Sequence, residues 1–533
     1  MTLILEDREY QNLAVSRGVE FLLQKKKRNG LVYMPTGSGK SLVIGRTAIE
    51  LANSAPVIVF QPTREILEQN FEKICSYGFR PEVFSASFGS RSIGEITLAT
   101  IGSVYKHPEW FEDFQFGLID EAHLVGVKDN SRQIVAGSEE GQFYHRDLGL
   151  VTMVLDQSDV PAGKIRVMDD DGTESIIAKP KKSMYRSFFD LLPHMRLLGY
   201  TASPYRLQAD ELKVITRTIP RIWNEFVHWT QNKDLFDAGY LAKLEYHKIK
   251  GFKRAAIATN STGAEFDEKE LQMHLWERNW ETKDKKSCNF QDKLTEVVNR
   301  LLAAGRRNVL VFTASIRESE YLAEQMEGEC AIITGQTPKD ERESTLQDFR
   351  SGAIKVVTNV GVLVHGFDFP ELECVVDAAP TMSLARYYQK LGRAIRSHPQ
   401  KESAWIVDMV EGYGQFGPVE SLHLYCQGNS RWDIFGRPGG GAEKQLTSVP
   451  IGGDGMKGCC PKCRARKWMA YYPKTSKWLP LSAPPQGSRA NVIVERQGSK
   501  SVCSIVKHGD PKATAVLHFT VCDKFKAARK DAA

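Results

Sequence analysis

A glycine-rich stretch near the start of the chain, MPTGSGKS at residues 34–41, constrains the fold more than any other part of the sequence. The apolar run Leu31–Met34 before it predicts a short strand, and Leu42–Leu51 after it has helical spacing. Strand, glycine loop and helix in this order are the context of a P-loop. In such a loop backbone N–H groups face phosphate, Lys40 reaches the β- and γ-phosphate oxygens, and the Ser41 hydroxyl ligates Mg²⁺. The first position of the pattern is Met34 instead of glycine.

A pair of carboxylates follows a second apolar run, in the stretch FGLIDEAHLVG. Phe116–Ile119 predicts a short buried strand, so Asp120 and Glu121 fall at its carboxyl end, where parallel sheets bind their ligands. Asp120 would hold Mg²⁺ through water, and Glu121 would orient or deprotonate the attacking water. The letters D-E-A-H alone are a weak signal, but their place after a P-loop and at a strand end makes this interpretation specific.

The size and composition are those of a multidomain globular protein. A chain of 533 residues predicts about three domains, at roughly 100 to 200 residues each. Hydrophobic residues make up 42% and charged residues 26%, which argues against bulk disorder. The sequence has no apolar run long enough for a bilayer, and MTLILEDREYQ lacks the basic start of a secretory signal. Together with cysteines scattered through ordinary core segments, this predicts a cytoplasmic location.

The net charge of +6 is unevenly distributed along the chain. From Met456 onward there are 16 Lys and Arg against four acidic residues, whereas the chain before it holds 55 basic and 61 acidic residues. A basic domain attached to a slightly acidic body is what a polyanion-binding attachment looks like. A solvated basic face gives the same count.

The order of these signals resembles superfamily 2 helicases with a D-E-A-H box, and further matches extend over roughly the first 400 residues. The stretch REYQ resembles the segment that reads adenine, with Gln11 able to pair with the adenine edge, although an exposed polar helix start explains it equally well. PTREILEQN resembles motif Ia, TLATIGSV motif Ib and GYTASPYR motif III, with Ser203 where relatives carry threonine. The resemblance implies nucleic-acid backbone contacts by Thr63, Arg64 and Thr100, and coupling of hydrolysis to strand movement by Thr201 and Ser203.

The second half of the resemblance covers a further α/β domain. NVLVFTASIRESEYLAEQM predicts strand, turn and helix and resembles motif IV, with Thr313 as a nucleic-acid contact. KVVTNVGVLVHGFDFP resembles motif V, in which Thr358 would hold a phosphate of the strand, with Gly366 and Asp368 facing the nucleotide. The residues that the resemblance places around ATP are Gln11, Pro35, Thr36, Gly37, Ser38, Gly39, Lys40, Ser41, Asp120, Gly366 and Asp368.

YYQKLGRAIR matches Q-x-x-G-R-x-x-R, the pattern of motif VI. Gln389, Arg393 and Arg396 recur at helical spacing, so one helix face can present two guanidinium groups. An arginine supplied from the second domain would stabilise the charge on the γ-phosphoryl oxygens, an effect of about 10³ to 10⁵ in the rate of other NTPases. The resemblance therefore implies that Lys40, Glu121 and Arg396 meet around one triphosphate.

An insert and a tail lie outside the motif series. GKIRVMDDDGTESIIAKPKK alternates on both sides of an Asp-Gly turn and predicts a β-hairpin, either a wedge near the nucleic acid or a surface decoration. In the tail, Cys460 and Cys463 form a C-P-x-C knuckle that suits two ligands of tetrahedral Zn²⁺. Cys503 and Cys522 would complete the site, but ordinary reduced cysteines are an equally open interpretation. The competing ligands are Cys459, His508 and His518.

The sequence therefore predicts an α/β fold with two tandem RecA-like domains built on parallel sheets and a small basic C-terminal domain, with or without zinc. The expected function is an ATP- and Mg²⁺-dependent helicase or translocase that acts on DNA in repair, recombination or replication, resembling the RadD-type repair helicases of bacteria and phages. An RNA helicase and an ATP-switched nucleic-acid-binding adaptor are the alternatives. The expected limits are 1–215 for the first RecA-like domain with an insert at about 130–185, 216–240 for a linker, 241–412 for the second RecA-like domain, 413–455 for a linker region and 456–533 for the basic domain.

Overall fold

The computed structural model divides the chain into two compact units. The first holds residues 1–208 and 213–448, and the second holds residues 209–212 and 449–533. The residues that the structure describes are 8–24, 28–125, 142–145, 149–154, 156, 158–161, 164–169, 172–178, 183–208, 211–218, 221–260, 265–276, 280–281, 287–326, 328–363, 369–427, 431–447, 468–472, 477–482, 492–497, 500–505 and 516–517.

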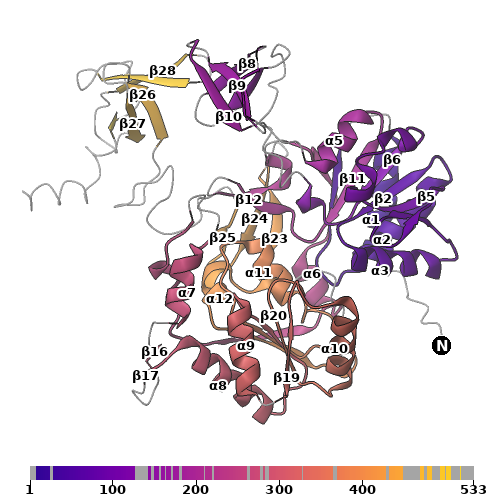
Figure 1. The fold of residues 1–533 in the computed structure, drawn as a ribbon, viewed down its shortest axis with the longest axis vertical. Coiled ribbons are helices and arrows are strands. Elements are labelled where there is room, and N and C mark those ends of the chain that lie inside the picture. Colours follow the sequence, from indigo (N-terminus) through magenta and orange to yellow (C-terminus); the bar gives the residue numbers. More distant parts are fainter. Residues whose placement is uncertain are drawn as a thin grey trace, which may run out of the picture. The chain divides into compact units, whose positions relative to one another are not determined.

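The first domain is built on an eight-stranded sheet of order β14-β1-β11-β6-β2-β5-β3-β4, drawn mostly in indigo and magenta in Figure 1. All neighbours pair in parallel except β3 and β4. The strands are β1 (Gly30–Tyr33), β2 (Val57–Gln61), β3 (Glu82–Ser85), β4 (Ser90–Arg91), β5 (Ile96–Thr100), β6 (Phe116–Ile119), β11 (Arg196–Thr201) and β14 (Glu225–Trp229). The helices of this domain are α1 (Glu9–Leu23), α2 (Lys40–Ala52), α3 (Arg64–Ser76), α4 (Ile101–Val104) and α5 (Met184–Leu191), with short 3-10 helices at Pro108–Phe111, Ala122–Leu124 and Ile215–Arg217.

The side chains of β2 alternate between the two faces of the sheet, and those on each face are buried under helices. Val57 and Val59 belong to the core cluster formed with α1, α2 and α3. Phe60 points to the opposite face, where its ring packs edge-on against Phe188 of α5 at a centroid distance of 5.6 Å. Helices on both faces explain why the strands are continuous apolar runs, which is typical of parallel sheets. The predicted strands at Leu31–Met34 and Phe116–Ile119 are confirmed as β1 and β6.

The insert between β6 and β11 contains a four-stranded antiparallel sheet of order β10-β9-β8-β7. The predicted hairpin is confirmed, because β9 and β10 pair from Met168↔Glu174 to Lys164↔Ala178. Ile165 and Val167 form a small core with Ile177. The strands are β7 (Gln142–His145), β8 (Gly149–Met153), β9 (Lys164–Asp169) and β10 (Glu174–Ala178), and β12 (Tyr205–Gln208) and β13 (Glu211–Val214) follow β11.

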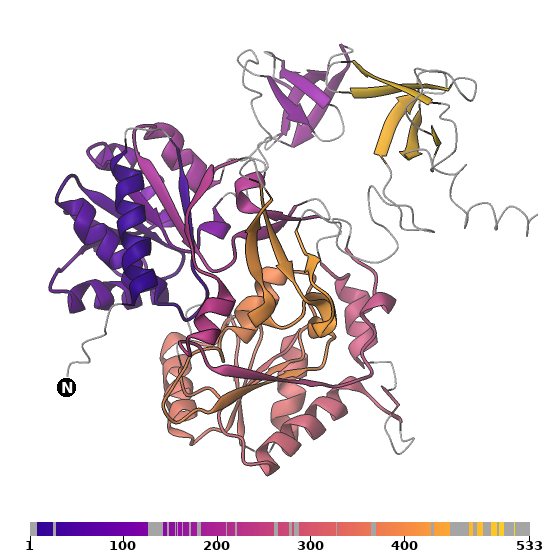
Figure 2. The same cartoon turned by 180° about the vertical axis from the view of Figure 1, so that it is seen from behind.

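The second domain has a six-stranded, fully parallel sheet of order β15-β22-β21-β18-β20-β19. Figure 2 shows it from behind, in rose to orange. The strand, turn and helix expected from NVLVFTASIRESEYLAEQM are confirmed as β18 and α9. The strands are β15 (Lys243–Lys248), β18 (Val309–Phe312), β19 (Cys330–Ile333), β20 (Val356–Asn359), β21 (Cys374–Asp377) and β22 (Ser403–Asp408), with the short pair β16 (Trp280–Glu281) and β17 (Ser287–Cys288). The helices are α6 (Asn232–Asp237), α7 (Glu268–Trp276), α8 (Phe290–Ala303), α9 (Ile316–Gln325), α10 (Lys339–Ser351), α11 (Leu384–Leu391) and α12 (Gly412–Phe416), and short 3-10 helices lie at Arg254–Ala256, Val419–Ser421 and Pro438–Gly440.

Residues 413–447, expected to be a linker region, hold a three-stranded antiparallel sheet of β23 (His423–Cys426), β24 (Trp432–Gly436) and β25 (Lys444–Gln445). Asp433 on β24 is fully buried and accepts hydrogen bonds from Arg217 Nη1 at 3.0 Å and Thr447 Oγ1 at 2.9 Å. The sheet is therefore tied to the segment between β13 and β14, which a flexible linker would not be.

The C-terminal unit contains a five-stranded sheet of order β28-β29-β26-β27-β30. Its strands are β26 (Trp468–Tyr472), β27 (Lys477–Ser482), β28 (Val492–Gln497), β29 (Lys500–Ile505) and β30 (Val516–Leu517). The expected fold class, two tandem RecA-like domains with parallel sheets, is confirmed, while a zinc-binding tail is not shown. None of the described helices combines the length and apolar character of a membrane-spanning segment.

Candidate nucleotide site between the two RecA-like domains

The glycine loop connects β1 to α2 with two residues in left-handed backbone. Gly37 has φ 80° and Gly39 has φ 81°, a region that residues with side chains rarely adopt. A Cβ on Gly39 would lie 2.3 Å from Gln11 Nε2, so this position also has no room for a side chain. The buried Ser38 hydroxyl donates to Pro35 O at 2.6 Å and closes the turn. The loop therefore places the N-terminus of α2 directly after Gly39, and backbone N–H groups at a helix start can bind phosphate.

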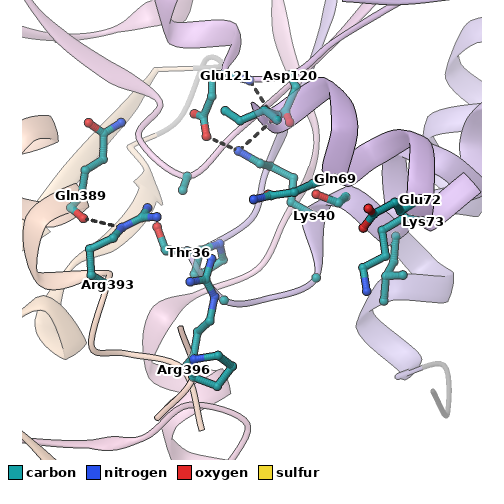
Figure 3. Close-up of a pocket in the computed structure, with 18 residues that line it drawn as sticks. Thr36, Lys40, Gln69, Glu72, Lys73, Asp120, Glu121, Gln389, Arg393 and Arg396 are labelled. Carbon is teal, nitrogen blue, oxygen red and sulfur yellow. Dashed lines mark hydrogen bonds and ion pairs between the residues drawn. The ribbon is translucent and has the colours of Figure 1, made fainter. Parts of the chain in front are cut away.

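A cavity of about 640 Å³ lies at this loop (Figure 3). Residues of both RecA-like domains line it. Lys40, Glu121 and Arg396, which were expected to meet at one site, are among them. From the first domain it is lined by Pro35, Thr36, Gly37, Gly39, Lys40, Ser41, Leu42, Ile66, Gln69, Glu72, Lys73, Asp120, Glu121 and Ala202, and from the second by Pro370, Gln389, Arg393 and Arg396.

Lys40 lies at the centre of a buried ion cluster. Its Nζ is 2.6 Å from Glu121 Oε1 and 3.0 Å from Asp120 Oδ1. Burial raises the pKa of Asp120, and burial would also raise that of Glu121, but the Lys40 ammonium and His123 bring the pKa of Glu121 below its usual range. Burial opposes the charge on Lys40, yet the two carboxylates raise its pKa above the ordinary value. An anion that formed an ion pair with Lys40 in their place would break the ion pairs of Lys40 with both carboxylates.

The donor set at this end of the cavity fits Mg²⁺. Asp120 follows β6 directly, and Ser41 lies in the first turn of α2. A carboxylate and a hydroxyl are the hard oxygen ligands that Mg²⁺ prefers. Asn70 of α3, which the sequence analysis missed, donates to Asp120 Oδ2 at 3.3 Å and orients this carboxylate. Asn70 closes the stretch PTREILEQN, so its place in motif Ia was the available signal.

His123 is the second residue that the sequence analysis missed, and it links the two domains. Its Nε2 is 3.3 Å from Gln389 Nε2, an amide donor, so this ring nitrogen accepts and Nδ1 carries the proton. The Nδ1 is 2.9 Å from Thr201 Oγ1, 3.3 Å from Ser203 Oγ and 3.2 Å from Glu121 Oε2. The expected coupling residues Thr201 and Ser203 thus lie in one buried hydrogen-bond network with His123 and Gln389, next to Glu121. His123 is the last letter of D-E-A-H, which was the available signal.

Gln11 is buried and its amide is already engaged. Its Nε2 donates to Ser38 O at 2.8 Å, and its Oε1 accepts from Arg8 N at 3.2 Å. Gln11 therefore holds the backbone of the glycine loop by its hydrogen bond to Ser38 O and does not line the cavity in this conformation. The alternative of an exposed polar helix start is wrong, because the side chain is 5% exposed.

Three of the expected nucleic-acid contacts lie together at the carboxyl ends of β2 and β5. Thr63 begins α3 and its hydroxyl accepts from Ile66 N at 3.4 Å. Arg64 donates from Nη1 to Ser87 O at 2.7 Å. Thr100 precedes α4, and its hydroxyl is 3.0 Å from Ser103 Oγ.

Two other expected nucleic-acid contacts need correction, because they lie inside the second domain. Thr313 is 3% exposed and its hydroxyl is 2.7 Å from Ser319 Oγ. Thr358, on β20 next to the edge strand β19, is fully buried. No phosphate of a nucleic acid can reach either hydroxyl in this conformation, since both are enclosed by packed side chains.

Several expected site residues lie outside the described residues. This applies to Gly366 and Asp368 of motif V, and to Cys460, Cys463 and Cys522 of the tail, while only the backbone of Cys503 on β29 is described. Within the part of the chain whose side chains are described, no cluster of His, Cys, Asp and Glu could hold a metal ion by itself.

Two families match the chain. Residues 4–144 match the family described as "Type III restriction enzyme, res subunit", and residues 292–398 match "Helicase conserved C-terminal domain". Among curated relatives, the DNA 3'-5' translocase XPB2 of Sulfurisphaera tokodaii is 22% identical over 77% of this chain and 83% of that protein. A 51.5 kDa protein of Lactococcus phage (isolate 7-9) is 24% identical over 46% of this chain and 49% of that protein. The chain thus spans about half the length of the phage relative.

Solved structures align with about three quarters of the chain at lower sequence identity. The helicase domain of Hef from Pyrococcus furiosus has a TM-score of 0.42 and 15% identity over 76% of this chain and 96% of that chain. The restriction-modification enzyme LlaBIII bound to DNA has a TM-score of 0.49 and 14% identity over 76% of this chain and 28% of that chain.

Proposed function

We propose, from the premise that this chain is a superfamily 2 helicase, that it hydrolyses ATP between its two RecA-like domains and uses the energy to move along a DNA strand. One observation carries the proposal: Lys40, Glu121 and Arg396, which come from three separate parts of the sequence, line the same cavity. A cavity of about 640 Å³ is within the size range of small-molecule sites, roughly 300 to 1,000 Å³.

Each residue has a role that its position supports. The triphosphate lies against the glycine loop and forms an ion pair with Lys40. Lys40 then no longer pairs with Asp120 and Glu121. Asp120 and Ser41 would hold Mg²⁺, which would neutralise part of the phosphate charge. Glu121, ionised by its low pKa, orients the attacking water.

The second domain completes the site and reports its state. Arg393 and Arg396 stabilise charge on the γ-phosphoryl oxygens, and that stabilisation is lost when the γ-phosphate leaves. The hydrogen bond between Gln389 and His123 carries the change to the Thr201 and Ser203 segment. Repeated closing and relaxing shifts the two domains along the bound strand.

DNA is the proposed substrate because the XPB2 relative, matched over 77% of this chain, is named as a DNA translocase. Within the superfamily we assign the chain to the D-E-A-H type, close to RadD-type repair helicases. Thr63, Arg64 and Thr100 are the proposed contacts with the strand's phosphates. The expected limit of 215 for the first domain is too short, because β14, inside the expected linker 216–240, pairs with β1 of its sheet. The other limits proposed are 241–412 and 456–533, with structural Zn²⁺ on the tail cysteines.

Steady-state ATP turnover tests the proposal, with single-stranded, duplex and branched DNA and RNA as activators. Lys40→Ala, Glu121→Gln and Arg396→Ala are each expected to lower kcat by at least about 10³-fold. Arg386→Ala is the matched control, because Arg386 lies on α11, just before the segment with Arg393 and Arg396, but its side chain is 61% exposed and does not line the cavity. Full stimulated turnover in any of the three site variants removes that residue from the mechanism.

The same panel separates the alternatives. If RNA stimulated ATP turnover more than DNA of the same sequence, the proposed substrate would be RNA instead of DNA. Salt-dependent binding of nucleic acid without any turnover would make the chain an ATP-switched adaptor. Metal analysis of the purified chain tests the tail, for which one bound zinc ion per chain is expected.

A further inference from the structure

Tyr388 connects the glycine loop of the first domain to the arginine-bearing segment of the second. It lies on α11, one residue before Gln389, and its ring is 1% exposed. The backbone N–H of Thr36, inside the glycine loop, donates to the Tyr388 hydroxyl at 3.2 Å. The hydroxyl in turn donates to Asn232 Oδ1 at 2.7 Å. A single phenol therefore bonds to the glycine loop of the first domain and to α6 of the second.

The direction of these hydrogen bonds is fixed by the surroundings of Asn232. This side chain is fully buried, and its Nδ2 donates to Val419 O at 3.1 Å and to Leu422 O at 3.2 Å. Because two carbonyl oxygens occupy the NH₂ side, the amide oxygen must face Tyr388 and accept its proton. Burial raises the pKa of Tyr388, so the phenol keeps the proton that it donates. Its lone pair is then available for the Thr36 N–H.

Packing around the loop leaves little freedom for the two elements to shift separately. A Cβ on Gly392, just beyond α11, would lie 3.1 Å from Thr36 Cγ2. A Cβ on Gly37 would lie 3.1 Å from Leu241 Cδ2 and 3.5 Å from Arg396 Cγ. The segment from Tyr388 to Arg396 therefore rests directly on the glycine loop, with the phenol as its hydrogen-bonded attachment.

We propose that Tyr388 is a positioning residue, whose hydroxyl couples the position of the glycine loop to the position of Arg393 and Arg396 across the cavity. The inference rests on the proposed function, since it assigns Tyr388 a part in the same ATPase site. It predicts that losing the hydroxyl leaves nucleotide binding intact and lowers the rate of the chemical step, because the arginines act on the transition state.

Tyr388→Phe removes one oxygen atom and keeps the buried ring. Tyr387→Phe is the matched control, because Tyr387 is the neighbouring residue, is also 1% exposed, and donates its hydroxyl to Gly417 O at 2.9 Å, away from the loop. The first readout needs no nucleotide: amide hydrogen exchange of the peptide that contains Thr36. We expect this exchange to rise about tenfold in Tyr388→Phe only, since the N–H loses its acceptor.

The second readout is ATP turnover with the best activating nucleic acid. In Tyr388→Phe we expect kcat to fall about tenfold with KM for ATP unchanged within about twofold, and in Tyr387→Phe both constants to stay at the parent values. A general loosening of the fold would instead raise exchange in many segments of Tyr388→Phe and would overturn the proposal.

The proposal is also overturned if Thr36 exchanges at the parent rate in Tyr388→Phe, if kcat is unchanged, or if Tyr387→Phe shows the same losses. Failure of the proposed function looks different: the parent chain itself would have no turnover. The amide exchange of the peptide with Thr36 would then still show whether the Tyr388 hydroxyl holds the loop. The proposed coupling to ATP hydrolysis would be refuted together with the proposed function.

Discussion

Replacing Lys390 by methionine tests what holds α11, the helix that precedes Arg393 and Arg396, to its own domain. Lys390 on α11 and Asp377 at the end of β21 form an ion pair in which each side chain is 2% exposed. Lys390 Nζ also donates to Ala379 O at 2.6 Å. Burial lowers the pKa of Lys390 and raises that of Asp377, so each charge is maintained by the other.

The expected magnitude follows from this burial. Lys390→Met leaves Asp377 as an uncompensated buried charge, and breaking a buried pair in this way costs about 3 to 5 kcal/mol. In a domain of about 150 to 250 residues each kcal/mol shifts Tm by roughly 2 to 4 °C, so Tm falls by roughly 6 to 20 °C. The double variant Lys390→Met with Asp377→Asn removes both charges and recovers most of this loss, because a neutral pair requires no desolvation of ions.

Differential scanning calorimetry of the two single variants and the double variant measures the effect and its coupling. Lys355→Met is the control, since the Lys355–Glu329 pair lies in the same domain but its side chains are 51% and 45% exposed. A surface pair of this kind is worth about 0 to 1 kcal/mol, so its Tm should change by less than about 4 °C. A Tm loss in Lys390→Met no larger than that of Lys355→Met would refute the reasoning.

Two further predictions concern the first domain. Gly199→Ala on β11 should cost about 1 to 3 kcal/mol in urea unfolding, because the new Cβ would lie 2.5 Å from Trp223 Cη2, whereas Gly102→Ala in open space on α4 should not lower stability. Burial, with the charge of Arg17 adding to it, lowers the pKa of His228 from 6.5 to about 4. Between these values the unfolded chain binds more protons than the folded one, so stability rises with pH across this window and is lost on acidification. His228→Gln should flatten this part of the profile of unfolding free energy against pH.

The residues that line the candidate nucleotide site on the first domain could be predicted from the sequence because their signals are local. Lys40 follows a glycine loop between a strand and a helix, and Asp120 and Glu121 follow a buried strand, so each position is set by a few neighbouring residues. Parallel sheets then bring the carboxyl ends of their strands to one edge. The resemblance to motif VI is what placed Arg396 at this cavity, but the expected single helix face is wrong, because α11 ends at Leu391 and both arginines follow it.

The errors lie where a residue's role depends on tertiary packing. Thr313 and Thr358 lie in the expected motifs, but the neighbouring strands and helices bury their hydroxyls. A sequence motif gives no information about such burial. The sheet at residues 413–447 was missed because its short strands lie among glycines and prolines that resemble a linker. His123 was missed because its partners Thr201 and Gln389 are far away in the sequence.

Three consecutive residues of α11 explain why this short helix can transmit a change at the cavity. Tyr388 bonds to the glycine loop, Gln389 faces His123 of the first domain, and Lys390 is paired with Asp377 of its own domain. Successive residues on a helix point about 100° apart, so α11 is held from different sides and cannot rotate without breaking one of these contacts. The contacts towards the first domain are neutral hydrogen bonds, each with a modest net free energy of about 0.5 to 1.5 kcal/mol, whereas the contact with its own domain is a buried ion pair. The helix should therefore separate from the first domain far more easily than from the second, and it would carry Arg393 and Arg396 with it when the cavity opens.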